Sequence, residues 1–421
     1  MDATAFRSWR EAFAEKHRRR VAGMTGEIAP EVNSELFWRL IFGAAAAGDQ
    51  ALAGRLLAQA FPDARHTSPF VLGRGETLAA WCGRHEIALR EVLPATDIAI
   101  PATSPYSRPY AYRTDPAVFA TLPNARWVAG WDSVIAADGA IIGDVNYMGM
   151  DRPHSRRPHI GIEGTGVFGY YAPPAEQFIE ADVLYLGGPV ENHFGHWMID
   201  FLPRLLGRDL APPGAKIAVP ATLSTKQHAL LALWGVNDDD LLLCPDDRTF
   251  VFRNLHVYAP GRAMPPNPAH VAAVRARIAA PATRPTSGKR FHLARGAVGT
   301  RRIANLESFE ALLAEHNIVT LDVGEMSIAA QRDALADAEV LLGAYGSNLL
   351  ALYFAPPGCT VIGLMDHPED DPTLPHTCHM LGMKHQFLVC AEAEQAGHWR
   401  MKKDKDIVVD CDELRERLRA I

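Results

Sequence analysis

The sequence lacks the features of a secreted or membrane-spanning protein. Its six cysteines are widely spaced among 421 residues and form no CxxC pair, which disfavours a disulfide framework and favours reduced thiols. No apolar run is long enough to cross a bilayer, and the basic cluster near the start is not followed by the apolar segment of a secretory signal. We therefore expect a soluble, cytoplasmic protein.

Strong charge of either sign is also missing. The net charge is only −7, which disfavours nucleic acid as a partner and excludes a disordered acidic tail. The basic run from Lys16 to Arg20 is interpreted as a solvated helix face, and the alternative is a peripheral contact with anionic lipid at the inner face of a membrane. The length and the 48% hydrophobic content permit a sizeable core and predict two or three domains. Nothing in the composition indicates the oligomeric state.

Four parts follow one another along the chain. Residues 1–88 are rich in alanine and have a helical pattern, which predicts a helical extension. Residues 89–283 begin with short alternating strands and continue with strands that alternate with helices. Residues 284–405 resume this alternation after a proline-rich passage, and residues 406–421 are predicted to form a last strand and helix.

Alternating strands and helices in the second and third parts predict α/β lobes built from right-handed βαβ units with parallel strands. Two such Rossmann-like lobes, separated by the proline-rich passage, predict a cleft between them. Ligands of these folds bind where the strands end at their carboxyl termini. Two turns are also predicted, a β-hairpin turn at Asp138-Gly139 and a break in a helical hairpin near Gly48.

The segment NHFGHWMIDFLPRL follows the expected strand DVLYLGG and therefore lies at this carboxyl end. With Asn192 as the helix N-cap, His196 and Asp200 are four residues apart on one helical face. Asp200 would accept the proton of one ring nitrogen of His196, which leaves the other nitrogen to take a proton from a substrate hydroxyl. The alternative is an amphipathic helix that packs well and carries no chemistry.

Metal binding is a weaker interpretation of the same segment. His193, His196 and Asp200 match a facial set of metal ligands, but the sequence has no HExxH pattern. An acidic run, NDDD, lies between a helix and a strand, which is the wrong end of a βα unit for catalysis. A second cluster lacks a closed zinc spacing and is interpreted as ordinary loop residues: His376, Cys378, His379 and His385.

Two further segments have the composition of a phosphate site. In LARGAVGTRRIANLESF, Arg295, Arg301 and Arg302 lie between a strand end and a helix start, where arginine forks and free amides suit a diphosphate. In LLGAYGSNLL, a strand turns through glycines into a short helix with Ser347 or Asn348 as its cap, and its amides suit phosphate or ribose. The alternatives are a flexible basic loop for the first and tight packing for the second.

Taken together, the three segments resemble glycosyltransferase family 61. NHFGHWMIDFLPRL, LARGAVGTRRIANLESFEALL and AEVLLGAYGSNLLALYFAPPGCTVIGL are similar in order and spacing to three elements of that family, over about residues 180–365. The ending DIVVDCDELRERL fits its last strand and helix, whereas the first 88 residues are not covered.

The resemblance implies a GT-B fold, in which two Rossmann-like lobes face a cleft. It implies inverting transfer of a sugar from a nucleotide-sugar donor to an acceptor hydroxyl, with no obligatory metal or other cofactor. The first lobe would bind the acceptor, which would be a glycan, a lipid-linked sugar or a protein. Such chemistry serves the synthesis of cell-surface polysaccharide or protein glycosylation.

Site roles follow from the resemblance residue by residue. His196 is the expected base, with His193 as the competing candidate, and Asp200 orients it. The arginines would clamp the diphosphate. Further expected contacts are divided between the donor and the acceptor: Tyr345, Gly346, Ser347 and Asn348 for the donor, and Asn192 and Arg204 for the acceptor.

The sequence departs from the family pattern at two positions. Tyr345 stands where the family has a histidine, and Gly363 stands where it has a glutamate well placed for ribose hydroxyls. These departures motivate an alternative function, a non-catalytic scaffold of a polysaccharide assembly complex that holds a partner with its helical extension. A metal-dependent hydrolase using His193, His196 and Asp200 is the third interpretation.

Overall fold

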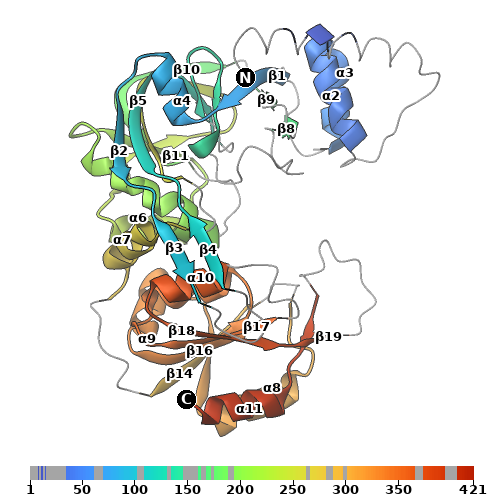
Figure 1. Cartoon of the computed structure of the whole chain (residues 1–421), viewed down its shortest axis with the longest axis vertical. Helices are drawn as coiled ribbons and strands as arrows, with labels where there is room; N and C mark the ends of the chain where they lie inside the picture. Colours follow the sequence, from blue (N-terminus) through green and yellow to red (C-terminus); the bar gives the residue numbers. More distant parts are fainter. Residues whose placement is uncertain are drawn as a thin grey trace, which may run out of the picture.

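The computed structural model of the chain describes most residues from 35 onward. The described ranges are 35–60, 70–101, 109–129, 134–145, 160–162, 167–171, 175–187, 194–261, 266–280, 288–296, 301–365, 373–393 and 405–421, together with positions 8, 11, 12 and 15. The chain is a mixed α/β protein with a sheet of 11 strands and a second sheet of five strands. Figure 1 shows the larger sheet above and the smaller sheet below.

Parallel strands form one end of the larger sheet. Its order there is β12-β11-β10-β13, so the first of these strands in the chain, β10, lies between the second and the fourth. This is the order of a Rossmann half-sheet, and its switch point lies between β10 and β13. The bounds are β10 Glu176–Tyr185, β11 Lys216–Pro220, β12 Leu241–Cys244 and β13 Thr249–Ala259, and helix α6, Thr225–Leu233, connects β11 to β12. The predicted strands and helix of this lobe are confirmed.

The β-rich segment extends the same sheet. Strand β5 is antiparallel to β13 along its whole length, from Val128 opposite Thr249 to Val118 opposite Ala259. The predicted hairpin is confirmed, since β6 and β7 pair on either side of Asp138 and Gly139, whose φ is +82°. The strands of this segment are β2 Leu89–Leu93, β5 Ala117–Val128, β6 Val134–Ile135, β7 Ile141–Ile142, β8 Ile160–Ile162 and β9 Val167–Tyr171. The short 3₁₀ helix η1, Gly143–Val145, follows β7.

Helices α2, Glu35–Ala47, and α3, Gln50–Ala60, form the helical hairpin predicted for the start of the chain, with Gly48 at a φ of +81° between them. The structure differs from the helical prediction at Phe70–Glu76, which is strand β1 and is followed by helix α4, Leu78–Arg84. β1 pairs with β7 and β9, and these non-local pairings override the local helical pattern. The basic run 16–20 lies outside the described residues.

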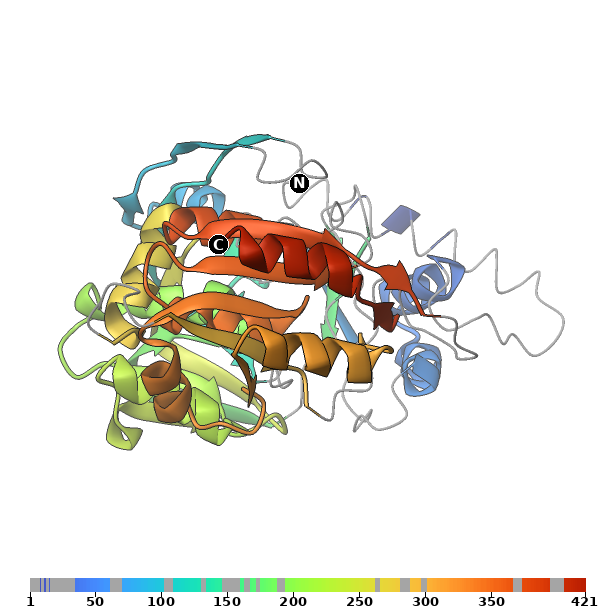
Figure 2. The ribbon, with the colours of Figure 1, turned by 90° about the horizontal axis from the view of Figure 1, so that it is seen from below.

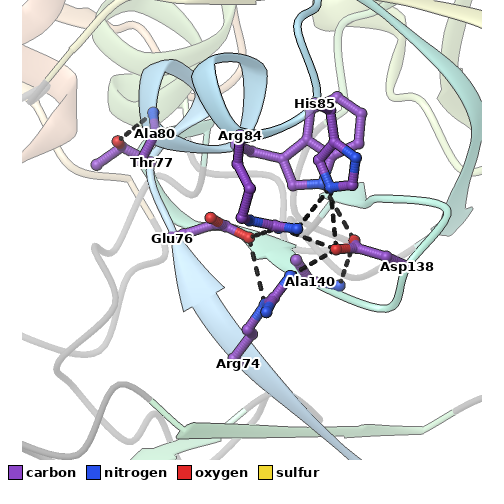
Figure 3. Close-up of polar contacts among 9 residues, drawn as sticks. Arg74, Glu76, Thr77, Ala80, Arg84, His85, Asp138 and Ala140 are labelled. Carbon is purple, nitrogen blue, oxygen red and sulfur yellow. Dashed lines mark hydrogen bonds and ion pairs between the residues drawn. The ribbon is translucent and has the colours of Figure 1, made fainter. Parts of the chain in front are cut away.

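A polar cluster fastens β1 and α4 to the hairpin turn (Figure 3). Asp138 accepts hydrogen bonds from Arg74 Nη2 at 2.6 Å, Arg84 Nη2 at 2.9 Å and Trp81 Nε1 at 3.1 Å. Burial alone would raise the pKa of the Asp138 carboxyl, but the hydrogen bonds from Trp81 and Arg84 outweigh it and hold the pKa well below its usual value. The N-terminal strand is therefore joined to the sheet by charge as well as by strand pairing.

The five-stranded sheet is wholly parallel, and its order is β15-β14-β16-β17-β18. In chain order this is 2-1-3-4-5, a doubly wound pattern with its switch point between β14 and β16. Helices α8 and α11 cover the face turned away from the larger sheet (Figure 2). The strands are β14 Lys289–Ala294, β15 Ile318–Asp322, β16 Ala338–Ala344, β17 Thr360–Met365 and β18 Lys384–Val389. The helices are α8 Leu306–Glu315, α9 Ile328–Leu335, α10 Thr373–Met380, α11 Cys411–Arg419 and the 3₁₀ helix η5 Ser347–Phe354.

The predicted elements of this lobe are present. Helix α8 packs on the sheet through Phe309 and Leu312, which are buried, whereas Leu306, its first residue, is 50% exposed. The interpretation of the second His/Cys cluster as loop residues is wrong, because His376, Cys378 and His379 belong to helix α10 and His385 lies in β18. The predicted last strand and helix are β20, Ile407–Val408, which pairs with β19, Ala391–Glu392, and α11.

The two sheets share one hydrophobic core. Trp197 and Leu205 from the larger-sheet part and Leu350 and Phe354 from the smaller-sheet part belong to the same buried cluster. Helix α7, Pro268–Ile278, contributes Val271 and Val274 to it. A two-stranded arm, β3 Asp97–Ile100 and β4 Tyr110–Arg113, reaches α10 of the lower part (Figure 1), where the Tyr112 ring stacks on His376 with centroids 5.5 Å apart. No helix in the described ranges has the length and apolar character that a bilayer crossing requires.

Candidate functional site

The segments singled out in the sequence lie at the switch points of the two sheets. The first follows β10, at the β10/β13 switch point, and the other two follow β14 and β16, at the β14/β16 switch point. At such a point the connections that follow adjacent strands run to opposite faces of the sheet, and ligands of such folds bind there. The three segments therefore lie where doubly wound folds bind their ligands.

His196 and Asp200 form the pair that their spacing predicted. Helix α5, Phe194–His196, continues as a π-helical turn, η2 Trp197–Phe201, and then as the 3₁₀ helix η3, Leu202–Asp209. His196 Nδ1 lies 2.6 Å from Asp200 Oδ2. The side chain of Asp200 is 3% exposed, whereas that of His196 is 31% exposed, so the imidazole is the member of the pair that solvent or a ligand reaches.

The irregular helix has a local cause. Pro203 has no amide hydrogen to donate to the carbonyl of Ile199, so an α-helical ladder cannot run through this position. The backbone widens to a π turn before the proline and tightens to a 3₁₀ helix from Leu202. Single π turns are rare and often coincide with functional sites, which agrees with the position of the His196–Asp200 pair.

Gly195 brings the histidine against the other lobe. A Cβ added at Gly195 would stand 2.9 Å from Leu350 Cδ1 and 3.2 Å from Ser347 Cβ, so only glycine permits this approach without displacing a neighbour. Ser347 begins η5, the turn that follows β16. The backbone next to His196 therefore packs directly on the predicted donor turn.

Arg295 and Arg301 converge on one carbonyl oxygen. Arg295 Nη1 donates to Tyr345 O at 3.0 Å, and Arg301 Nη1 donates to the same oxygen at 2.7 Å. Arg301 has a φ of +56°, a left-handed conformation that disfavours non-glycine residues and that recurs at functional sites. The structure thus gathers two of the three predicted clamp arginines beside the predicted donor turn.

Gly346 and Asn348 complete this turn. A Cβ at Gly346 would lie 1.8 Å from Arg295 Nη1, so the absence of a side chain is what lets the guanidinium cross the backbone here. Asn348 Nδ2 donates to Leu293 O at 2.8 Å and ties η5 to the end of β14. The turn is therefore braced from the end of β14, by Leu293 and Arg295.

Arg302 has a different set of partners from the other two arginines. Its backbone amide and Nε donate to the two carboxylate oxygens of Asp406, at 2.8 and 2.9 Å, and Asp406 is only 2% exposed. This bidentate pair fastens the arginine loop to the chain just before β20. A contact between Arg302 and a diphosphate stays a prediction.

Arg204, predicted to contact the acceptor, is 1% exposed. It donates to Leu186 O at 2.8 Å and to Val145 O at 2.6 Å, and its guanidinium lies over the rings of Tyr185 and Phe201. These contacts support the end of β10 from within, which favours an indirect role. The acceptor role stays a prediction. Asn192 and His193 lie outside the described residues.

The position of Gly363 explains one departure from the family pattern. Gly363 lies inside β17, where an added Cβ would be 3.2 Å from Leu374 Cδ2 and from the Phe387 ring. Any side chain here, a glutamate included, would require Leu374 or Phe387 to shift by a few tenths of an ångström. Ribose recognition in this chain, if it uses a carboxylate, therefore requires another residue.

Metal ligation has no support in the described ranges, which contain no group of three or more His, Cys, Asp or Glu side chains arranged to hold an ion. The set that includes His193 lies partly outside those ranges. Asp238–Asp240 form the 3₁₀ helix η4, in which Asp240 pairs with Arg208 at 3.0 Å.

Two residues of this region escaped sequence reasoning. Nothing in the sequence around Gly195 indicated its importance, because that importance depends on a contact with the turn at Ser347, about 150 residues further along the chain. Asp322 is the last residue of β15, and both of its carboxylate oxygens lie within 3 Å of the Cβ position of Gly296, next to Arg295. Its place at the end of the predicted strand NIVTLDV was the available signal.

Two switch points between parallel strands, one followed by a histidine–aspartate pair and one by converging arginines, are compatible with a Rossmann-like α/β fold. Residues 194–362 match the family described as Glycosyltransferase 61, so this part of the chain is similar to that family. The matched span contains the His196–Asp200 pair, the arginines and the Tyr345 turn. Glycosyl transfer is therefore the activity that the family indicates. No curated protein matches the chain.

Proposed function

We propose that the chain is an inverting glycosyltransferase of the GT-B type. In this proposal the larger-sheet lobe binds the acceptor and the five-stranded lobe binds a nucleotide-sugar donor. The observation that carries it is the contact of Gly195 with Ser347, which sets His196 beside the turn braced by Arg295 and Arg301. The base, His196, and the diphosphate clamp, Arg295 and Arg301, then lie on opposite sides of the Gly195–Ser347 contact. Transfer between two bound substrates requires the base and the clamp to be held close together in this way.

His196 would act as the general base. With its Nδ1–H donated to Asp200, the lone pair on Nε2 accepts the proton of the acceptor hydroxyl as that oxygen attacks the anomeric carbon of the donor sugar. The bond from this carbon to the nucleotide phosphate breaks on the opposite face, so the configuration inverts. Asp200 holds the tautomer and stabilises the imidazolium that forms.

The arginines would stabilise the leaving group. Negative charge develops on the nucleoside diphosphate as it departs, and the guanidinium groups of Arg295 and Arg301 provide fixed positive charge at the switch point. Because this charge is supplied by the chain, the proposal requires no metal. Tyr345, Gly346, Ser347 and Asn348 would shape the donor site, and Asn192, His193 and Arg204 would shape or support the acceptor side.

The acceptor is a glycan, a lipid-linked sugar or a protein hydroxyl, and the role that follows is the synthesis of cell-surface polysaccharide or protein glycosylation in the cytoplasm or at its membrane face. Nucleotide sugars with different bases and sugars, offered with and without candidate acceptors, test the proposal. Transfer or slow donor hydrolysis is the expected result. If calorimetry detected no binding of any nucleotide sugar, the proposal would be refuted. If, in addition, a partner protein co-purified with the chain, the scaffold function would be favoured.

Histidine substitutions test the assigned chemistry. His196→Ala should lower the rate by about two to four orders of magnitude while donor affinity changes little, because the base acts on the acceptor proton. His228→Ala is the matched control, since His228 is also a half-exposed histidine on a helix and pairs with an aspartate, Asp238, at 3.3 Å. Equal rates for the two variants would remove His196 from the mechanism. Stoichiometric metal in the active protein would instead favour the hydrolase.

A further inference from the structure

Recognition of the nucleotide ribose is the missing part of the proposed donor site. The family pattern places a glutamate where this chain has Gly363, at which an added Cβ would lie only 3.2 Å from Leu374 and Phe387. A ribose offers hydroxyl donors, for which a carboxylate is the strongest acceptor among side chains. Another carboxylate at the carboxyl edge of the five-stranded sheet could supply this acceptor.

Asp322 is such a carboxylate. It ends β15 directly opposite Ala294, the last residue of β14, so it lies one strand away from the switch point and beside Arg295. Its Oδ2 and Oδ1 atoms lie 2.6 and 2.9 Å from the position that a Cβ would take at Gly296. Gly296 has a φ of +56°, and only glycine leaves space for the carboxylate there. The chain thus keeps this carboxylate against the backbone of the arginine loop.

The loop after Asp322 is held from three sides. Asp322 Oδ1 accepts the amide of Gly324 at 3.0 Å. Gln331 Nε2 donates to Val323 O at 2.8 Å, and Lys226 Nζ, which comes from α6 in the other lobe, donates to the same oxygen at 2.9 Å. Among the residues that the structure describes, no group donates a hydrogen bond to Oδ2 of Asp322, whereas Oδ1 accepts the amide of Gly324. Within this described part of the chain, the carboxylate is therefore held through Oδ1, which leaves Oδ2 for a ligand.

We propose that Asp322 binds the ribose hydroxyls of the donor nucleotide, an inference that rests on the proposed function of the site. In doubly wound sheets a nucleotide lies across the carboxyl edge with its phosphates at the switch point, and an acid at the end of the next strand accepts hydrogen bonds from the ribose. Here the arginines mark the phosphate position and β15 is the next strand. The substrate class is thereby narrowed to ribonucleoside diphosphate sugars, as opposed to deoxyribonucleotide sugars.

The test compares ribose with deoxyribose at the same site. UDP, GDP, CDP and ADP, with their 2′-deoxy and 3′-deoxy counterparts, are titrated into the full chain by calorimetry. The wild type should bind a ribonucleotide more tightly than at least one deoxy counterpart by a factor of about 10 or more, the value of a hydrogen bond to a charged group. Asp322→Asn should reduce this preference to about twofold or less, since the amide is a weaker acceptor.

The asparagine keeps an Oδ1 for the Gly324 amide, so the loop should fold as before. Asp322→Ser, whose hydroxyl also caps that amide, replaces it if the asparagine variant does not fold. Glu325→Gln is the matched control, because Glu325 is an exposed acid of the same loop, and it should keep the preference. If the substitution only disturbed the folding of this loop, it would weaken the binding of all nucleotides equally. The ratio of the ribonucleotide affinity to the deoxyribonucleotide affinity would then stay unchanged.

The outcomes separate the two proposals. Binding of no nucleoside diphosphate to the wild type overturns the proposed function and this inference together. Binding without a preference for ribose, or a preference that survives in Asp322→Asn or Asp322→Ser, overturns the role of Asp322 and leaves the glycosyltransferase proposal standing. A preference lost in the Asp322 variants and kept in Glu325→Gln supports both.

Discussion

Replacing Asp144 by asparagine should change how the stability of the chain depends on pH. Burial raises the pKa of the Asp144 carboxyl from 3.8 to about 6, a shift that the amide of Leu78, which donates to Oδ1 at 2.8 Å, only partly opposes and that the nearby charge of Asp115 increases. The folded state therefore holds a proton on Asp144 more tightly than the unfolded state does. The contribution of protonated Asp144 to the free energy of unfolding is fully present below pH 3.8. This contribution is lost as the pH rises through about 6.

The magnitude follows from the shift. A difference of about 2 units at about 1.4 kcal/mol per unit gives at most about 3 kcal/mol lost between pH 4 and pH 7. Asp144→Asn cannot ionise and keeps an acceptor for the Leu78 amide. The unfolding free energy of the variant, relative to that of the wild type, should therefore rise by about 2 to 3 kcal/mol from pH 4 to pH 7.

Urea unfolding followed by tryptophan fluorescence at several pH values measures this difference. All other titrating groups are common to both proteins, so their contributions cancel in the comparison. Glu91→Gln, at an exposed position of β2, is the control and should show a difference that does not vary with pH. A pH-independent difference for Asp144→Asn as well would refute the argument that this carboxyl is charged at a cost in the folded state.

Two further predictions concern the donor turn and the N-terminal strand. Gly346→Ala should weaken nucleoside diphosphate binding about 10- to 100-fold, because the added Cβ would stand 1.8 Å from Arg295 Nη1 and displace the guanidinium. Gly54→Ala is the control, since a Cβ at Gly54 meets nothing within 4 Å, and it should bind the nucleotide normally. Equal nucleotide affinities for the two variants would contradict the arginine clamp. Asp138→Asn should lower the unfolding free energy at pH 7 by about 2 kcal/mol. Because the pKa of Asp138 is held below 3.8, that loss should persist at pH 5 and shrink progressively as the pH falls from about 3.8 toward the lower pKa of the folded state. A loss that vanished by pH 5 would contradict the assignment.

Local periodicity was sufficient to predict the parallel strands and their helices. DVLYLGG, KIAVP and TVIGLM are apolar runs of strand length, and each is a strand of the structure. The contact of His196 with Asp200 also followed from spacing, although the turn is π-helical where an α-helix was expected. A separation of four residues brings the side chains together in either geometry.

The errors arise where distant parts of the chain decide the structure. Phe70–Glu76 became a strand through pairing with β7 and β9, which no local window contains. The contact between Arg302 and Asp406 was not predicted either, because Asp406 lies more than 100 positions later in the chain. The length of β5 and its antiparallel pairing with β13 likewise depend on a partner far along the chain.

The shared hydrophobic core also has a consequence for how the chain unfolds and for how its two lobes evolve. Trp197 and Leu205 from one lobe and Leu350 and Phe354 from the other are buried in a single cluster. Either lobe synthesised alone would leave its side of this cluster in contact with water, so the lobes should unfold in one cooperative transition. Recombination between the two sheets would separate matched surfaces. The pair of lobes is therefore the unit on which selection for stability acts.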